Sequence, residues 1–263
     1  MAEVVRQELL TIQEGQIDGI LRQLHGSETP LGIPVYTAGM VLGDISGSAF
    51  LIDKPEGWTS YDIIRRLKRY FPKSVKIGHA GTLDPLATGL LILLFGKATK
   101  AQQAYLALPK VYYGTMRLGE VTPSMDAETD VTERRDITTV TPRQIELACA
   151  AHTGTIEQIP PMYSAVKVGG ERLYKKARRG ESILRKPNTV TVSAFDLLDV
   201  AGADVRFRVQ CSKGTYIRAL AHDVGQSLGV GAYLTKLRRT AIGEYCVEHA
   251  WDMQQLISVL EDR

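Results

Sequence analysis

The sequence predicts an α+β fold, in which the strands of a β-sheet are interspersed with amphipathic helices. Residues 90–95 form an uninterrupted apolar run bounded by glycines, which is typical of a fully buried strand. Residues 205–211 alternate apolar and polar side chains, which indicates a strand with one buried face. A helix over residues 142–152 is predicted after Thr141, because proline suits the first helical position.

Composition restricts the class of protein. The 263 residues carry a formal net charge of +3, a mildly basic balance that permits a polyanionic partner without requiring one. Three cysteines (Cys149, Cys211 and Cys246) lie far apart, which argues against a disulfide framework and against a zinc site. No apolar segment approaches the length of a membrane span, and the start of the chain lacks a signal-peptide pattern. We therefore expect a cytoplasmic protein with no membrane partner.

The first part of the chain predicts an extension. Residues 3–24 have the apolar spacing of an amphipathic helix, and residues 26–47 are rich in glycine and proline. We assign residues 1–47 to an N-terminal helix and linker, and residues 48–263 to the main domain. We favour a helix docked on that domain; a separate interaction module is the alternative.

The main domain begins with a predicted strand over residues 49–55, which ends at its proline. Ser60 is the expected cap of a helix over residues 61–70, and another helix is predicted over residues 96–107. A further amphipathic helix, around residues 251–260, closes the chain.

Two elements carry residues that attract attention. Residues 111–118 predict a strand, in which Tyr112 and Tyr113 face opposite sides, so that only one of them points into a given site. Arg218 falls in the first turn of a helix over residues 217–228, an unfavourable place for a cation. We expect it to meet a carboxylate or a phosphate there.

The most basic stretch of the chain also holds aromatic residues. Lysines and arginines recur from Lys167 to Lys186, with Tyr163 and Tyr174 among or beside them. This mixture suits a nucleic-acid backbone with exposed bases, and it equally suits a solvated loop. The stretch alone does not decide between the two readings.

A loop with one carboxylate precedes the buried strand. Asp84 lies within the segment from Gly78 to Gly89, among small, turn-forming and apolar residues. Its type and setting favour an aspartate that caps the loop, with a reactive carboxylate as the alternative. No phosphate-binding loop, metal-ligand spacing or nucleophile elbow is present, so we expect neither a metal nor a cofactor.

The segment from Gly78 to Gly89 closely resembles the catalytic motif of the TruB family of tRNA pseudouridine synthases. Further segments match that family in the same order along the chain: Asp53-Lys54-Pro55-x-Gly57-x-Thr59-Ser60, Lys110-x-Tyr112, Arg117-Leu118-Gly119, Pro160 to Lys167, Ser212 to Arg218, and Leu237 to Thr240. Chance agreement is implausible, because these motifs are long and span residues 50–243.

The resemblance implies three catalytic residues. It makes Asp84 the catalytic aspartate and Arg218 the arginine that pairs with it. Tyr112 matches the tyrosine that stacks on the target base and is placed to take the proton from its C5. The resemblance leaves open whether the aspartate attacks C1′ of the ribose or removes a ribose proton.

The resemblance also implies the residues that bind the substrate. Leu237 matches the apolar wall of the uracil pocket, and Tyr216 matches its second tyrosine. His79 matches the histidine that fills the RNA stack after the target nucleotide has flipped out. Lys213 and Lys54 match further positions near the site, of which we expect Lys213 to contact the substrate.

The fold and partner implied by the resemblance are specific. The fold is a pseudouridine-synthase-like mixed β-sheet flanked by helices, with an inserted thumb over residues 160–189 that clamps RNA. The partner is the T-arm of tRNA, in which the uridine at position 55 becomes pseudouridine. Expected contacts to the RNA backbone come from the thumb: Lys175, Lys176, Arg178 and Arg179. Because the reaction loses no atoms and involves no redox step, no cofactor is expected.

Two departures from the family stand out. Only about twenty residues follow the region of Leu237, so no separate C-terminal RNA-binding domain is expected. Pro123 replaces the usual acidic residue of its segment, although Asp126 is retained. The alternatives are a guide-RNA-dependent synthase acting on ribosomal RNA and an RNA-binding or RNA-folding protein without turnover. We expect a monomer, although no residue pattern determines the oligomeric state.

Overall fold

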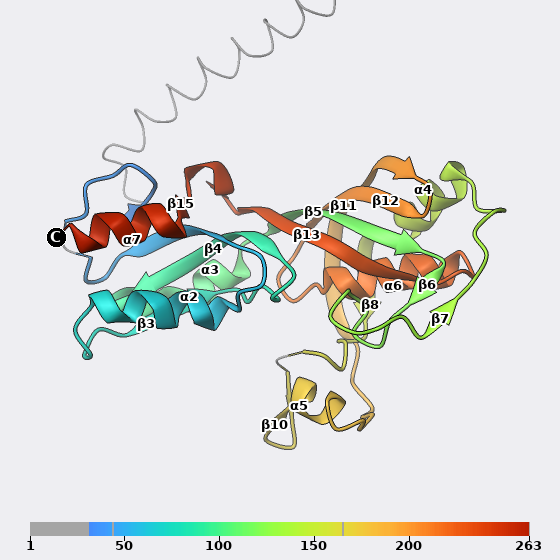
Figure 1. Cartoon of the computed structure of the whole chain (residues 1–263), viewed down its shortest axis with the longest axis horizontal. Helices are drawn as coiled ribbons and strands as arrows, with labels where there is room; N and C mark the ends of the chain where they lie inside the picture. The colour runs from blue at the N-terminus through green and yellow to red at the C-terminus, as the bar shows by residue number, and fades with distance from the viewer. Residues whose placement is uncertain (1–31, 44, 165, 263) are drawn as a thin grey trace, which may run out of the picture.

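The computed structural model describes residues 32–43, 45–164 and 166–262, so the helix predicted over residues 3–24 lies outside the described residues. Within the described residues, the chain forms an 11-stranded mixed sheet that runs the length of the molecule (Figure 1). Its main path follows the order β1 (Val35–Tyr36), β2 (Ala49–Lys54), β4 (Thr88–Phe95), β13 (Ala232–Ile242), β5 (Lys110–Leu118), β12 (Asp204–Cys211), β11 (Asn188–Ala201) and β8 (Gly154–Gln158). Three short strands pair at its sides: β3 (Ile77–Ala80) with β4, β14 (Tyr245–Cys246) with β13, and β15 (Trp251–Asp252) with β2.

The half of the sheet around β4 is covered on both faces. Leu91, Leu93 and Phe95 pack with α2 (Ser60–Leu67) and α7 (Met253–Glu261). The intervening residues of β4 face the opposite layer, which contains η2 (Gly96–Ala101), α3 (Gln102–Ala107) and the buried ring of Tyr105. This arrangement explains the uninterrupted apolar run and confirms the prediction of a fully buried strand.

The other half of the sheet is covered on one face. Val205, Phe207 and Val209 of β12 join a core with α4 (Pro142–Ala151) and α6 (Ile217–Ser227). The intervening Arg208 lies on the open face, where it pairs with an aspartate of β11 at 2.9 Å. The alternation predicted for this strand is therefore confirmed, with its polar side chains on the solvent face.

β13 joins the two halves of the sheet. It runs parallel to β4 over a short register that pairs Arg239 with Gly89, and antiparallel to β5 along most of its length. Gly89 has a φ of +100°, and a Cβ there would collide with the backbone of Arg239. Only glycine therefore lets the loop that ends at Gly89 approach β13 so closely. The loop containing Asp84 is delivered to the middle of the sheet.

Several sequence expectations need correction. The cap of α2 is Thr59 rather than Ser60, because Thr59 and Asp62 form a reciprocal capping box. Ser60 instead exchanges hydrogen bonds with the backbone of Leu83. The helix predicted over residues 61–70 is α-helical only to Leu67 and continues as η1 (Lys68–Tyr70). Residues 96–107 begin as the 3₁₀ turns of η2 before α3 starts.

Some elements were not predicted. β11 and β13 are long strands, and β1 pairs with β2 from within the stretch assigned to the linker. Two short strands, β6 (Glu120–Val121) and β7 (Glu133–Arg134), pair with each other beside β13. The turn η3 (Val247–His249) precedes β15. Among the described residues, no helix combines the length and apolar character that crossing a membrane requires.

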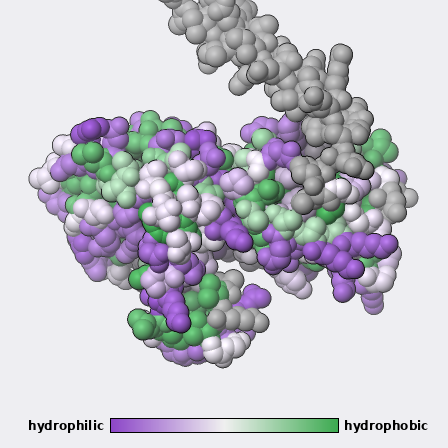
Figure 2. Space-filling model, turned by 180° about the vertical axis from the view of Figure 1, so that it is seen from behind, coloured by the Kyte–Doolittle hydropathy of each residue, from purple (hydrophilic) through white to green (hydrophobic). Residues whose placement is uncertain are grey.

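The segment between β8 and β11 projects from the body as a thumb. It contains β9 (Lys167–Val168), β10 (Glu171–Arg172) and α5 (Leu173–Ala177), of which the two strands pair with each other. Front and back views both show it standing away from the sheet (Figures 1 and 2). Leu173 is fully buried within it, so the thumb has a small apolar centre of its own.

Candidate active site

A pocket of about 270 Å³ opens where the Asp84 loop, β5, β13 and the start of α6 meet. Its lining includes most of the residues expected at the site: Asp84, Tyr112, Lys213, Tyr216, Arg218 and Leu237. His79 is not among the lining residues. It lies on β3, and its Nδ1 atom is buried with no hydrogen-bond partner among the described residues.

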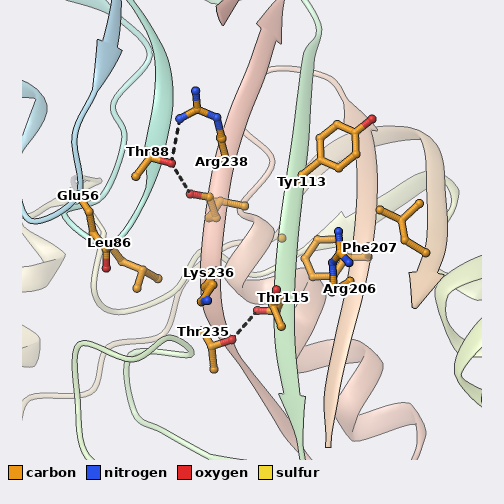
Figure 3. A pocket seen from close by; sticks show the side chains of 13 residues that line it. Glu56, Leu86, Thr88, Tyr113, Thr115, Arg206, Phe207, Thr235, Lys236 and Arg238 are labelled. Atoms are coloured by element: carbon orange, nitrogen blue, oxygen red, sulfur yellow. Dashed lines mark hydrogen bonds between the residues drawn. The ribbon is translucent and has the colours of Figure 1, made fainter. Parts of the chain in front are cut away.

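A second hollow, of about 280 Å³, lies on the other face of β5, where Tyr113 lines it instead of Tyr112 (Figure 3). Arg238 within it pairs with Asp53 at 2.7 Å, and Arg206 faces an aspartate at 4.0 Å. Its arginines are thus already matched by carboxylates. The pocket around Asp84 is the candidate active site, because it holds an aspartate that is paired with a buried arginine, beside the largely buried phenol of Tyr112.

The loop that carries Asp84 is held from both sides. The Ser60 hydroxyl accepts a hydrogen bond from Leu83 N at 2.9 Å, and the carbonyl of Pro85 accepts one from Gly57 N at 2.8 Å. Lys54 is fully buried, and its ammonium donates to the carbonyls of Pro55, at 2.8 Å, and Trp58, at 2.6 Å. A weaker contact of 3.4 Å reaches Pro85 O. Burial lowers the pKa of Lys54 to about 8.

Arg218 connects the Asp84 loop to the rest of the pocket. Its Nε lies 3.0 Å from Asp84 Oδ2 and 3.3 Å from Asp126 Oδ2. Its Nη1 donates to Ser124 O at 2.9 Å, and its Nη2 donates to Tyr163 O at 2.8 Å. With its side chain only 4% exposed, the guanidinium is oriented by contacts on several sides. The carboxylate partner expected for this cation is therefore in place.

Asp126 is the site residue that the sequence reasoning left without a role. Its side chain is 1% exposed, and its Oδ1 accepts a hydrogen bond from Glu128 N at 2.9 Å. The preceding Met125 has a φ of 63°, and its carbonyl accepts from Leu234 N at 3.0 Å. The sequence offered one indication of a role for Asp126: it is retained in a segment where Pro123 replaces the acidic residue usual in the motif. Its contact with Arg218 depends on a tertiary fold that brings distant segments together.

The two carboxylates around Arg218 differ in exposure. Asp84 keeps 40% of its side chain open to the pocket, whereas Asp126 is sealed behind the guanidinium. Burial raises the pKa of Asp84 above its usual range, the Arg218 charge opposes this rise, and the neighbouring Asp126 charge adds to it. Asp84 is thus the carboxylate that a bound molecule can reach.

Among the other lining residues, Tyr112, Tyr216 and Leu237 are the aromatic and apolar side chains that were expected at the site. Tyr112 and Leu237 are each 8% exposed, and they approach the pocket from neighbouring strands. Tyr216 stands just before α6, where Gln158 accepts a hydrogen bond from its N–H at 2.7 Å and donates to its carbonyl at 3.0 Å. Gln158, which the sequence reasoning did not single out, thereby holds the entry to α6.

The basic residues of the thumb divide into two groups. Arg178 pairs with Glu128 at 3.1 Å, and Arg179 pairs with Glu171 through two hydrogen bonds of 2.8 Å. Lys175 forms no ion pair with any described residue, and it is exposed. The arginines therefore support the thumb internally or tie it to the body, while Lys175 is free to meet a ligand.

No group of three or more histidines, cysteines, aspartates or glutamates within residues 32–43, 45–164 and 166–262 could hold a metal ion. The pocket chemistry available in the described part of the chain is that of one reachable carboxylate, its guanidinium partner, the guanidinium of Arg239, phenols and lysines. Such a set can move protons and stabilise charge.

Comparisons with known proteins identify related sequences. Residues 68–217 match the family model described as TruB family pseudouridylate synthase, N-terminal domain. Residues 218–262 match the model described as tRNA pseudouridylate synthase B C-terminal domain. The second match covers α6, β13 and α7, which belong to the same sheet assembly as the first.

Curated relatives are similar over most of this chain. A tRNA pseudouridine synthase B of Burkholderia mallei (strain NCTC 10247) is 49% identical over 212 residues, which cover 81% of this chain and 70% of the relative. A protein of the same name from Paenarthrobacter aurescens (strain TC1) is 44% identical over 217 residues, covering 80% of this chain and 70% of the relative.

A solved structure is also similar. A chain in the crystal structure of a Cbf5-Nop10-Gar1 complex aligns with a TM-score of 0.62 and 32% identity. The alignment covers 80% of this chain and 53% of the other, so this chain spans about half the length of that relative.

Proposed function

This chain belongs to the TruB family of pseudouridylate synthases and is a tRNA pseudouridine synthase, and we propose that it isomerises the T-loop uridine at position 55 with Asp84 as the catalytic carboxylate. The observation that carries the assignment of Asp84 is its pairing with buried Arg218 at 3.0 Å, at the floor of a pocket that Tyr112 also lines. A loop-capping aspartate would not need such a partner.

The reaction is a rearrangement within one nucleotide. The N1–C1′ bond breaks, the uracil rotates, a C5–C1′ bond forms, C5 loses its proton and N1 gains one. Asp84 initiates this exchange at the sugar, and Arg218 keeps the carboxylate oriented toward the pocket. Tyr112 stacks on the uracil and takes the C5 proton.

The target uridine must leave the folded T loop to reach this pocket. Flipping a base costs about a few kcal/mol of unstacking. Tyr112, Tyr216 and Leu237 offset part of that cost by enclosing the uracil, since all three line the pocket. His79, outside the pocket lining, occupies the gap in the RNA stack, and Lys213 at the pocket mouth contacts the substrate.

The thumb is the second RNA-binding element in this proposal. Lys175 and Lys176 meet phosphates of the T-arm, while Arg178 and Arg179 reach phosphates by exchanging their present carboxylate partners. We further propose that the enzyme works as a monomer in the cytoplasm, where the chain meets tRNA.

A guide-RNA-dependent reaction is the weaker candidate. The likeness to the Cbf5 complex includes only about half of that solved chain, and its identity of 32% is below the 49% shared with a tRNA synthase. Activity on a bare T-arm hairpin, with no guide RNA added, separates the two.

The test is tritium release from a T-arm hairpin labelled at C5 of the target uridine. We expect the wild-type protein to release tritium and the Asp84→Asn variant to release none while still binding the hairpin. Absence of release by the wild-type protein on hairpin and on full-length tRNA would overturn the proposed activity.

A further inference from the structure

Arg239 is a buried cation to which the proposed chemistry gives no task. It is 1% exposed and is the largest of the fully buried side chains. No aspartate or glutamate of the described residues forms an ion pair with it, in contrast to Arg218 and Arg238. A buried charge is costly unless it is paired and hydrogen-bonded, so an unpaired guanidinium in the core calls for a reason.

Arg239 lies next to both the Asp84 loop and Tyr112. Its Nε donates to Leu90 O at 2.7 Å, and its Nη2 donates to Gly81 O at 2.9 Å. These two bonds fasten the beginning of the catalytic loop to β4. Arg239 also lies directly opposite Tyr112 in the pairing of β13 with β5, and both residues line the pocket.

Gly81 leaves room for the guanidinium of Arg239. Gly81 has a φ of +92°, and a Cβ at this position would lie 3.3 Å from Arg239 Nη1. A side chain larger than hydrogen would therefore press on the guanidinium. The catalytic loop passes directly over the cation, and its conformation depends on that contact.

The charged groups that act on Tyr112 have both signs. Arg239 from β13 and Asp84 from the catalytic loop both act on its phenol, together with Cys211 from β12. Arg239 is itself close enough to influence other titratable groups: Lys54, His79, Lys110 and Cys211. Lys110 is 5% exposed and donates to the carbonyls of Leu106 and Leu108, both at 2.6 Å. Arg239 is thus the cation that favours ionisation of the Tyr112 phenol, while Asp84 and Cys211 oppose it.

We propose that Arg239 is a positioning residue for Tyr112: its guanidinium holds the phenol against the pocket and stabilises the phenolate that removes the C5 proton of the substrate. This inference rests on the proposed function and deepens it. Burial raises the pKa of Tyr112, and the Arg239 charge acts in the opposite direction. The guanidinium, which has no carboxylate partner among the described residues, is the counter-ion when the Tyr112 phenol gives up its proton.

The proton transfer balances without any further reactant. The phenolate oxygen of Tyr112 takes the proton from C5 of the rearranged uracil, and the C5–H bonding electrons re-form the C5–C6 double bond. The negative charge moves onto the ring at N1. The phenol then returns this proton to N1 directly or through water, which regenerates the phenolate. Arg239 stabilises the negative charge while it is on the Tyr112 phenolate. It does not itself lose a proton, because guanidinium stays protonated in proteins.

The decisive variants are Arg239→Met, which removes the charge, and Arg239→Lys, which retains it. Arg238→Met is the matched control, because Arg238 is the next residue of the same strand and pairs with Asp53 outside this pocket. For each protein, the single-turnover rate of pseudouridine formation on T-arm RNA is measured across neutral and alkaline pH. Affinity for the RNA and thermal unfolding are measured in parallel.

Arg239→Met should lower the single-turnover rate by about 100-fold, the lower range for a proton-transfer group, with RNA affinity unchanged. Its rate should recover as pH rises, because deprotonation of Tyr112 no longer has the guanidinium to favour it. Deuterium at C5 of the target uridine should slow this variant more than it slows the wild-type protein. Arg239→Lys should keep most of the rate and the wild-type pH dependence.

A rate loss that is equal at every pH and insensitive to deuterium would overturn the proposal, since it would mean that Arg239 only supports the fold. A wild-type rate in Arg239→Met would overturn it as well. If Arg239→Met does not fold, Arg239→Gln takes its place: it must lower the rate in the wild-type protein and add no further rate loss in the Tyr112→Phe background. Failure of the proposed function is distinguishable, because the wild-type protein itself would then form no pseudouridine.

Discussion

Removing the Arg218 charge should lower the free energy of unfolding, because the buried carboxylate of Asp126, which the substrate does not reach, then loses its partner. In Arg218→Met, the carboxylate of Asp126 is left 1% exposed and without its cation. Deleting one partner of a buried ion pair costs about 3–5 kcal/mol of unfolding free energy. Asp84 contributes little to this loss, because 40% of its side chain is already open to water.

A second substitution separates stability from catalysis. Arg218→Met/Asp126→Asn contains no unpaired buried charge, and the asparagine can still accept from Glu128 N. We expect it to recover about 2–3 kcal/mol of the loss, the excess that an unpaired buried charge imposes over neutral groups. Activity should stay absent in both variants, because neither offers Asp84 a guanidinium.

Urea unfolding measures the stabilities, and tritium release from the labelled hairpin measures activity. Arg208→Met is the matched control, since Arg208 pairs with Asp196 at 2.9 Å on the solvent face, where an ion pair contributes about 0–1 kcal/mol. Equal losses in Arg218→Met and Arg208→Met would refute the reasoning. So would a double variant that is no more stable than Arg218→Met.

Three further predictions follow from the same structure. Because burial raises the pKa of Asp84 and the ionised form is the active one, the single-turnover rate should fall with decreasing pH at a midpoint above the ordinary 3.8; a midpoint at or below that value would contradict it. Replacing Lys175 and Lys176 by glutamine should reduce the slope of log affinity against log salt by about 2, and an unchanged slope would exclude phosphate contact there. Gly89→Ala should lower the free energy of unfolding, measured in urea, by at least about 3 kcal/mol or prevent folding, because the added Cβ would collide with the backbone of Arg239. Gly202→Ala, with a φ of +61° and open space around it, should lower the same free energy by about 1–2 kcal/mol.

The fold was predictable wherever one strand or helix carries a complete pattern. The apolar run of β4 and the alternation of β12 correspond to a layer covered on both faces and a layer covered on one. β13 was not predicted, because its sequence lacks a regular apolar pattern. It holds both buried Arg239 and half-exposed Arg238, so its apolar periodicity is broken where it joins β4 to β5.

The lining of the pocket was predictable for residues within recognisable motifs. Asp84, Tyr112, Arg218 and Leu237 line one pocket, as their motifs led us to expect. The motifs could not show that Arg218 is shared with a second carboxylate, because that contact requires the segment before Glu128 to fold back onto α6. They also could not show that the thumb arginines already have carboxylate partners.

For Asp84, the sequence and the tertiary structure each supplied a different part of the description. The sequence by itself determined that a lone carboxylate sits on a glycine-bounded loop before a buried strand, and which family carries that motif. Only the tertiary structure decided what surrounds the carboxylate: Arg218 at 3.0 Å, a sealed second aspartate behind it, and buried Arg239 beneath the loop. The physical reason is that charge and hydration depend on distances between segments far apart in the chain, which local residue patterns do not encode.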